Sequence, residues 1–440
     1  MDTRLASWTL FAMLGFAILA PLLTIGPSNT HTDAAGTGNL ARQLGYTLMF
    51  MLALVSARVI GHPERLWAPT ASVLAMLAWC CLSMTWAVDR GVGARRLILT
   101  LIVVFSIFLL VRRAGYERTV AVVRSLLPLI LVVNYAAVIA VPGWAIHQTT
   151  FEDDPSIIGA WRGILMNKNL AGPVCAYTII FFMLDARSIK RVIRFAVVVV
   201  AALFLYHTQS KSSFGCLAAS VGLGVLFTKY DPYYRAIVVT SLIMGACLAG
   251  YWVFLNWDFL TAPFYHEDFL TGRVQIWPLL IDYWKDHWLL GSGYGSFWNV
   301  HNPQPIYEYA RGRGWVTGIA SGHNGYLDLL VQTGLPGLLL AVVAIVVAPM
   351  RTFLTSVSLD RSRGSLLLAC ISFAVFHNLT ESSIFDTDAA VNVFFMLGIA
   401  LLSVEARARS LQLSASGLAH KWRLGGQSLP RSRQLSDQGA

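Results

Sequence analysis

Apolar residues recur along this chain in runs of about 20 residues, and short polar segments separate the runs. A run of this length crosses the hydrocarbon core of a bilayer, roughly 30 Å thick, as a single α-helix. The pattern therefore predicts an all-α integral membrane protein with about 12 transmembrane helices. The expected spans are 6–26, 43–60, 67–87, 97–111, 120–141, 169–185, 192–207, 213–228, 236–256, 325–349, 364–378 and 389–404.

The composition supports the same fold class. Of 440 residues, 56% are hydrophobic and 13% are charged, about half the charged share of a soluble protein. This excludes a soluble enzyme, a disordered chain and a fibrous protein. We expect one polytopic membrane domain over residues 1–410, with an uncleaved first span rather than a signal peptide. The function must then lie in the loops and in the few polar residues beside the spans.

Lysine and arginine gather in alternate short loops and in the C-terminal segment. By the positive-inside rule these loops are cytoplasmic, and twelve spans place both termini on that side. Residues 411–440 are rich in Ser, Gly, Arg and Gln, and we expect a disordered basic cytoplasmic tail. The tail from Arg407 carries about half of the net charge of +10. Such a charge beside a membrane favours anionic lipid and gives no support to nucleic-acid binding.

Two of the predicted outer loops are long, 142–168 and 257–324. The larger one, between helices 9 and 10, is rich in Trp, Tyr, Phe and Gly, which is not the composition of a disordered segment. Within it, Arg273 to Leu290 forms an amphipathic pattern whose aromatic residues suit the outer membrane interface.

Several cations lie at the outer ends of spans, with no acid adjacent in sequence; they are Arg162, Lys168, Lys211 and Arg273. A cation near hydrocarbon is costly unless it is paired or solvated, so such residues mark a functional site by default. A lipid-linked diphosphate would supply the missing negative charge. Each cation could instead be an interfacial anchor whose long side chain reaches the headgroups. The predicted outer loop 88–96 also holds Arg90, Arg95 and Arg96, against the positive-inside rule. Either the span count is off near this loop or these arginines have a role on the outer side, and the second is favoured because most later loops keep the alternation.

His323 follows a glycine-rich segment at the mouth of the tenth span. Its ordinary pKa near 6.5 lets it accept a proton from a sugar hydroxyl at neutral pH, although a lone histidine can also be structural. The GSGYG run from Gly291 lacks the spacing of a nucleotide-binding loop and is expected to form a turn. The histidines show no metal-binding spacing, and the six cysteines lie in apolar runs without a CxxC pair, so we expect no metal and no cofactor.

Three strings identify a family resemblance: GRVQIWPLLIDYW, LLGSGYGSFW and SGHNGYLDLLVQTGLPG. Together with RGILMNKNLAGP, QSKSS and SMTWAVDRGVGARRL, they make residues 80–390 resemble the O-antigen ligase/polymerase superfamily. Within it, the chain is most similar to the exopolysaccharide polymerases of the succinoglycan type. The resemblance implies an inner-membrane glycosyltransferase, metal-independent and inverting, that acts at the periplasmic face on undecaprenyl-diphosphate-linked glycan.

The resemblance also implies roles for individual residues. Arg162 and Arg273 match the diphosphate-binding arginines, and His323 matches the base or acceptor-orienting histidine. The family often has His-Lys-Asn where this chain has Asn167-Lys168-Asn169, so a catalytic role at position 167 is doubtful. The candidate catalytic residues are thus His323, Arg273 and Arg162. The candidate binding residues are Lys168, Asn169, Lys211, Asn324, Arg95 and Arg96.

Three functions remain open. The first is a polymerase of exopolysaccharide repeat units, whose partners would be a lipid-linked glycan donor, a glycan acceptor, membrane lipid, a flippase and a chain-length regulator. The second is an O-antigen ligase, which would move glycan to lipid A core or another acceptor with the same site. The third is a polysaccharide or lipid transporter. A transporter is disfavoured because the large loop has no counterpart in the first half of the chain and no internal repeat is visible.

Overall fold

The structure is a computed structural model that describes residues 2–24, 40–148, 157–256, 273–300, 303–310, 316, 319–356 and 359–425. Over these residues the regular elements are helices, and the isolated bridge between Ile146 and Trp161 is the sole β pairing. The longer helices are α1 (Asp2–Leu19), α2 (Leu40–Ser56), α3 (Ala71–Ser83), α4 (Arg90–Ala140), α6 (Lys168–Met183), α7 (Arg191–His207), α8 (Lys211–Phe227), α9 (Arg235–Leu255), α11 (Arg273–Asp286), α12 (Gly325–Val342), α14 (Arg361–His377) and α15 (Ala390–Gly425).

Shorter elements join these helices. The 3₁₀ helices are η1 (Ala20–Thr24), η2 (Pro63–Trp67), η4 (Pro232–Tyr234) and η6 (Pro305–Glu308). The helix α5 covers Pro142–Ala145, and α12 continues through a π-helical turn, η8 (Val343–Val347), into α13 (Ala348–Thr355).

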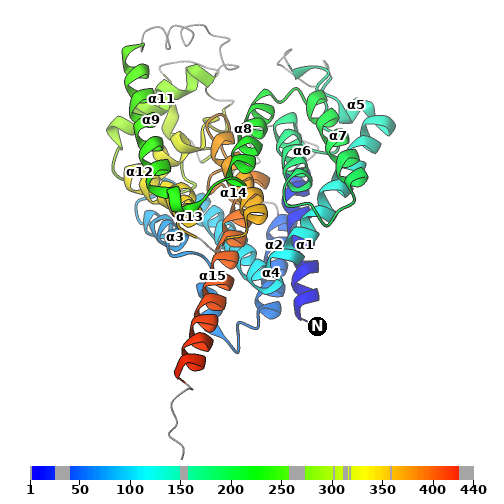
Figure 1. Ribbon diagram of the computed structural model, residues 1–440. Helices are drawn as coiled ribbons and strands as arrows, with labels where there is room; N and C mark the ends of the chain where they lie inside the picture. Colours follow the sequence, from blue (N-terminus) through cyan, green and yellow to red (C-terminus); the bar gives the residue numbers. More distant parts are fainter. Residues whose placement is uncertain are drawn as a thin grey trace, which may run out of the picture.

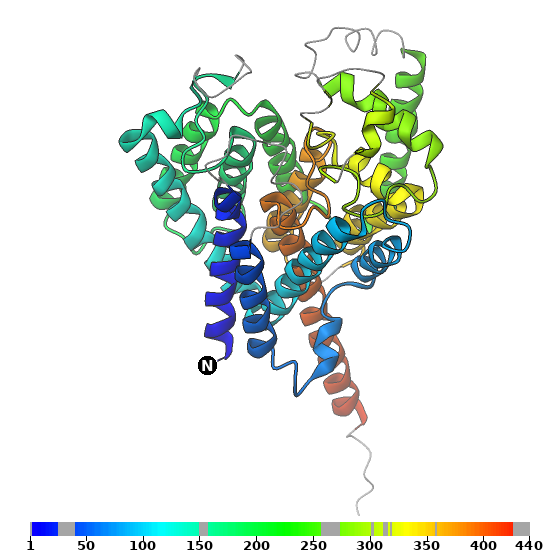
Figure 2. The ribbon, with the colours of Figure 1, turned by 180° about the vertical axis from the view of Figure 1, so that it is seen from behind.

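Each of the twelve expected apolar segments overlaps a helix of the structure. Within the part of the chain that the structure describes, five helices are long and apolar enough to cross a membrane, and four shorter helices are also apolar. The protein is therefore a multi-pass helical membrane protein, whereas the count of twelve spans stays a prediction. The N-terminus and the far end of α15 lie at one end of the molecule, and α5 and α11 lie at the other (Figures 1 and 2).

The fourth and fifth expected spans form one element, α4. The two halves meet at Gly115, whose φ of 76° and ψ of 174° are not helical. Glycine adopts this conformation without the steric cost that a side chain would add. The break lies in the basic segment that separates the two expected spans, so the chain turns there without a loop.

In the main core, α1, α2, α6 and α15 pack against α4, while α7 packs on α6 and α8 packs on α14. A second, smaller cluster joins α11 to the turn at 291–300 and to α12. It buries the apolar side of α11 through Ile276, Leu279, Leu280 and Tyr283. The amphipathic helix expected from Arg273 is thus present, and its apolar side packs on protein rather than on lipid. Trp288, beyond the helix end, is exposed.

The expected tail boundary at residue 410 falls inside α15, which continues to Gly425. Residues 426–440 lie outside the described residues, as does the beginning of the large outer loop, 257–272.

Gly334→Ala is expected to destabilise the fold strongly. Gly334 has φ of 66° and ψ of −176°, a region open essentially to glycine alone, and an added Cβ would collide with the carbonyl of Leu289. The backbone strain alone costs about 1–3 kcal/mol. A thermal scan of the detergent-extracted protein should show a large drop in Tm. The control is Gly222→Ala in α8, where a Cβ would meet open space; an equal drop in both variants would contradict the argument.

Candidate active site

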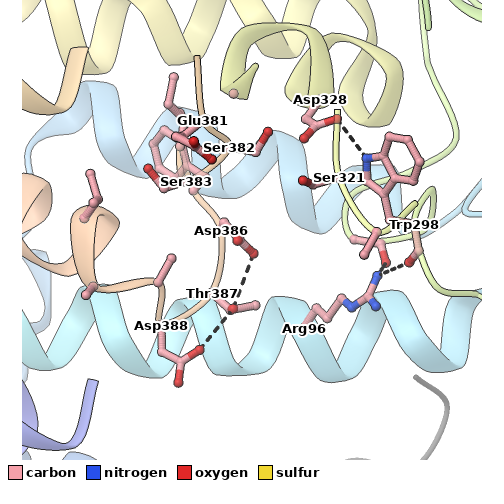
Figure 3. Close-up of a pocket in the computed structure, with 18 of the residues that line it drawn as sticks. Arg96, Trp298, Ser321, Asp328, Glu381, Ser382, Ser383, Asp386, Thr387 and Asp388 are labelled. Atoms are coloured by element: carbon pink, nitrogen blue, oxygen red, sulfur yellow. Dashed lines mark hydrogen bonds between the residues drawn. The ribbon is translucent and has the colours of Figure 1, made fainter. Parts of the chain in front are cut away.

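A cavity of about 900 Å³ lies among segments that are far apart in the sequence. Its walls come from the start of α2, the start of α4, the N-terminal turn of α6, the turn at 294–299, the first half of α12 and the segment 381–391. Most of the polar side chains on the walls come from 381–388, α4 and α12 (Figure 3). The cavity is large enough for an oligosaccharide-sized ligand.

Three of the side chains at this site form a connected cluster, in which Glu381 joins the other two. Arg273 Nη2 donates to Glu381 Oε1 at 2.5 Å, and His323 Nδ1 lies 3.2 Å from Glu381 Oε2. The side chains of Arg273 and Glu381 are 12% and 13% exposed, and that of His323 is 37% exposed. Glu381 lines the cavity, whereas His323 and Arg273 are bonded to it and do not line the cavity themselves. The cluster therefore borders the cavity and keeps its histidine partly open to solvent.

The carboxylate of Glu381 determines which ring nitrogen of His323 carries the hydrogen. Burial alone would raise the pKa of Glu381, but the hydrogen bond from His323 and the charge of Arg273 outweigh it and lower that pKa. An ionised carboxylate can only accept a hydrogen bond, so Nδ1 of His323 carries the hydrogen. Nε2 is then the nitrogen that can take a proton, the arrangement a general base needs.

The backbone around α12 explains why these residues meet. Asn324 caps the helix, its side chain accepting from the N–H groups of Tyr326 and Leu327, and its Nδ2 donates to Leu379 O. The N–H of Gly325 donates to the carbonyls of both Asn378 and Glu381, at 2.9 and 3.0 Å. The start of α12 is thereby tied to the turn after α14. His323, immediately before the cap, has a φ of 49°, an uncommon conformation for a residue with a side chain.

Asn324 is therefore the N-cap of α12, and it does not line the cavity.

Two of the three arginines of the loop that breaks the charge rule, Arg95 and Arg96, line the cavity, and Arg90 does not. Nη1 of Arg96 donates to the carbonyls of Gly295 and Trp298, at 2.7 Å each, and Arg95 is exposed and lines the cavity. The GSGYG run forms a turn, as expected: Gly291, Gly293 and Gly295 all have positive φ. Arg96 therefore holds this turn against α4 (Figure 3).

The predicted cations near the starts of α6 and α8 are not on the cavity wall. Arg162 stacks over Trp144, 4.6 Å from the ring centroid, and donates to the carbonyls of Trp144 and Met166. Lys168 begins α6, and Lys211 is an exposed residue at the start of α8. These three residues do not line the cavity, although Asn169 does. Asn167 lines it too and caps α6 by accepting from Leu170 N at 2.9 Å.

Sequence reasoning missed the acids of 381–388 as site residues. Asp386 projects into the cavity (Figure 3), and Asp388 pairs with Arg42 of α2. Burial in the protein, followed by the neighbouring charge of Asp388, raises the pKa of Asp386 to about 6. Its side chain still contacts solvent inside the cavity. The sequence signal that could have revealed these acids is the composition of the predicted outer loop 379–388, which has acidic and hydroxyl side chains and no lysine or arginine.

Two further residues of the cavity wall were not predicted. Asp328 accepts from Trp298 Nε1 at 2.8 Å and from Gly322 N at 3.0 Å. His377 is buried, and neither of its ring nitrogens has a hydrogen-bond partner among the described residues. Over the same residues no group of three His, Cys, Asp or Glu side chains could hold a metal ion, and the expectation that no metal is needed stays a prediction.

Comparison with known proteins adds an independent finding. Residues 175–342 match the family described as O-antigen ligase. The chain is also 24% identical over 245 residues to the exopolysaccharide production protein ExoQ of Rhizobium meliloti (strain 1021). That alignment covers 52% of this chain and 54% of the relative, so the chain spans about half the length of the curated relative it matches. These matches confirm that the chain resembles the O-antigen ligase/polymerase superfamily, whose members transfer glycans in polysaccharide biosynthesis.

Proposed function

We propose that this protein polymerises oligosaccharide repeat units carried on undecaprenyl diphosphate, at the periplasmic face of the bacterial inner membrane, during exopolysaccharide biosynthesis. The observation that carries the proposal is the Arg273–Glu381–His323 cluster at the border of the polar cavity. It brings a cation, a carboxylate and a base together from three segments. The printed name of the relative, an exopolysaccharide production protein, supports the choice of product.

The proposed reaction is a single displacement that inverts the anomeric carbon. The acceptor hydroxyl oxygen attacks that carbon while His323 Nε2 takes the hydroxyl proton. The bond from the anomeric carbon to the phosphate oxygen breaks, and undecaprenyl diphosphate leaves with the electron pair. Arg273 has four N–H groups beyond the one bonded to Glu381, and these can hold the charge that grows on the leaving phosphate. No metal ion is required for these steps.

The other predicted residues have supporting roles in this proposal. Arg162 and Lys168, with Lys211, would attract the diphosphate to the outer ends of α6 and α8. Arg95 and Asn169, which line the cavity, would contact the sugars. A flippase would deliver the donor and a chain-length regulator would act on the product.

The second candidate function is that of an O-antigen ligase, which would transfer finished glycan to lipid A core or another acceptor. The family description matched by residues 175–342 favours it. The same cluster would serve both reactions, because only the acceptor differs.

The decisive experiment uses the purified full-length protein in nanodiscs with undecaprenyl-diphosphate-linked repeat units from the source cell, without nucleotide or metal. A polymerase is expected to give a ladder of lengthening lipid-linked products on a gel. Transfer that appears only after lipid A core is added would identify a ligase. Failure of both reactions would overturn the proposal and favour a polysaccharide or lipid transporter.

A further inference from the structure

One carboxylate on the cavity wall has neither a salt bridge nor a short hydrogen bond to the residues that the structure describes. Of the four acids on its wall, Glu381 pairs with Arg273, and Asp388 pairs with Arg42. The Asp328 carboxylate accepts from Trp298 and Gly322. Among the described residues, the carboxylate of Asp386 accepts a single long hydrogen bond, 3.5 Å, from Thr387, and Figure 3 shows it pointing into the cavity.

Groups with unused hydrogen-bonding capacity surround the same space. Asn169 and Arg95 line the cavity, and neither side chain bonds to any residue that the structure describes. His377 also lies on the wall. It is buried, and neither of its ring nitrogens has a hydrogen-bond partner among the described residues. A buried polar side chain without a partner is costly, so His377, together with the unused hydrogen-bonding groups of Asn169 and Arg95, indicates a polar ligand in this cavity.

The charges of the wall select between the two ends of a lipid-linked glycan. The lining holds three arginines against four carboxylates, so it offers no net attraction for a diphosphate. A carboxylate, an amide and a guanidinium with free capacity are instead suited to sugar hydroxyls, which both donate and accept hydrogen bonds. The cavity reaches the catalytic cluster through Glu381, so a sugar that fills the cavity would present a hydroxyl to His323.

We propose that this cavity is the acceptor-glycan subsite and that Asp386 binds the acceptor, its carboxylate accepting hydrogen bonds from sugar hydroxyls while Asn169 and Arg95 donate to sugar oxygens. The subsite deepens the proposed function and rests on it. The donor diphosphate lies outside this cavity, on the side of Arg273 and His323.

The test measures binding of a lipid-free repeat-unit oligosaccharide, released from the exopolysaccharide of the source cell, to the full chain in nanodiscs by titration calorimetry. Asp386→Asn is expected to weaken binding at least about tenfold, the value of one good charged hydrogen bond. Asn169→Ala should weaken it as well. The matched control is Asp282→Asn on α11, whose carboxylate pairs with Lys285 away from the cavity.

The pH dependence gives a second readout. Asp386 faces Asp388 and Asp328 together with Arg96 and Arg42, and its pKa is raised to about 6. Protonation removes acceptor capacity, so binding by the wild type should weaken as the pH falls from 7 to 5. Asp386→Asn should lose most of that dependence.

The outcomes separate this subsite from the proposed function. Glycan binding that needs Asp386, in a protein that makes no polymer, would support the subsite and defeat the polymerase. A polymer ladder from Asp386→Asn with an unchanged KM for the acceptor would overturn the subsite alone. Absence of glycan binding by the wild type would overturn it too.

Discussion

His323→Ala is expected to abolish chain growth while the protein still inserts in the membrane. The structure places its imidazole against Glu381 with Nε2 left to take a proton, and a positioned base contributes about 10²–10⁴-fold to a proton-transfer step. The side chain is partly exposed and its loss opens no core cavity, so the amount of folded protein should stay near that of the wild type. The measurement is the rate of ladder formation per mole of nanodisc-embedded protein.

The matched control for this variant is His287→Ala. His287 is an exposed histidine just after α11 that stacks on Tyr283, and it does not line the cavity. It should retain near-normal chain growth. Normal polymer from His323→Ala would remove the base from the proposed mechanism.

Glu381→Gln is expected to lower kcat on the order of 10²-fold. The amide keeps the shape of the side chain but loses the charge that orients His323 and balances Arg273. A glutamine can present its NH₂ group to either partner, so the hydrogen on His323 is no longer confined to Nδ1. The pKa of Glu381 is lowered, so the wild-type carboxylate stays ionised at mildly acidic pH. Its negative charge is lost only when the pH falls below the ordinary pKa range of a glutamate.

A double-mutant cycle separates this positioning role from simple damage. If Glu381 acts through Arg273, the double variant Arg273→Ala with Glu381→Gln should lose much less than the product of the two single losses. Glu308→Gln, at an exposed position of η6, is the control and should change nothing. Independent, fully multiplicative losses would show that the two residues do not work as a unit.

The helical architecture could be predicted because bilayer thickness sets a length that apolar runs must match. The join inside α4 could not, since only the backbone at Gly115 shows that the basic segment between the two expected spans stays helical on both sides of a single break. The sequence pattern also could not predict which surface the apolar side of α11 packs against. An amphipathic stretch fits a membrane surface or a protein surface equally well, and only the partner residues of α12 and of the turn at 291–300 distinguish them.

The candidate site was predicted in part. His323 and Arg273 could be found because they stand in distinctive local strings, and the structure brings both to one carboxylate. Glu381 could not be placed, because it is 58 residues from His323 and 108 from Arg273 along the chain. The residues Arg162, Lys168 and Lys211 share an expected membrane side with the cluster but are not on the cavity wall. Charge and topology predict a side of the membrane, not a contact.

The segment that matches the family, 175–342, is not the segment that encloses the cavity. Much of the wall is contributed by residues before and after it, including Arg42, Arg95 and Asp386. Two relatives can therefore share the recognisable signature and still differ in the shape and charge of the chamber. Diversification of the glycan could then proceed through the flanking helices while the signature stays constant, so a chimera that exchanged only 175–342 is expected to keep the part of the sugar preference that Arg95 and Asp386 of the host determine.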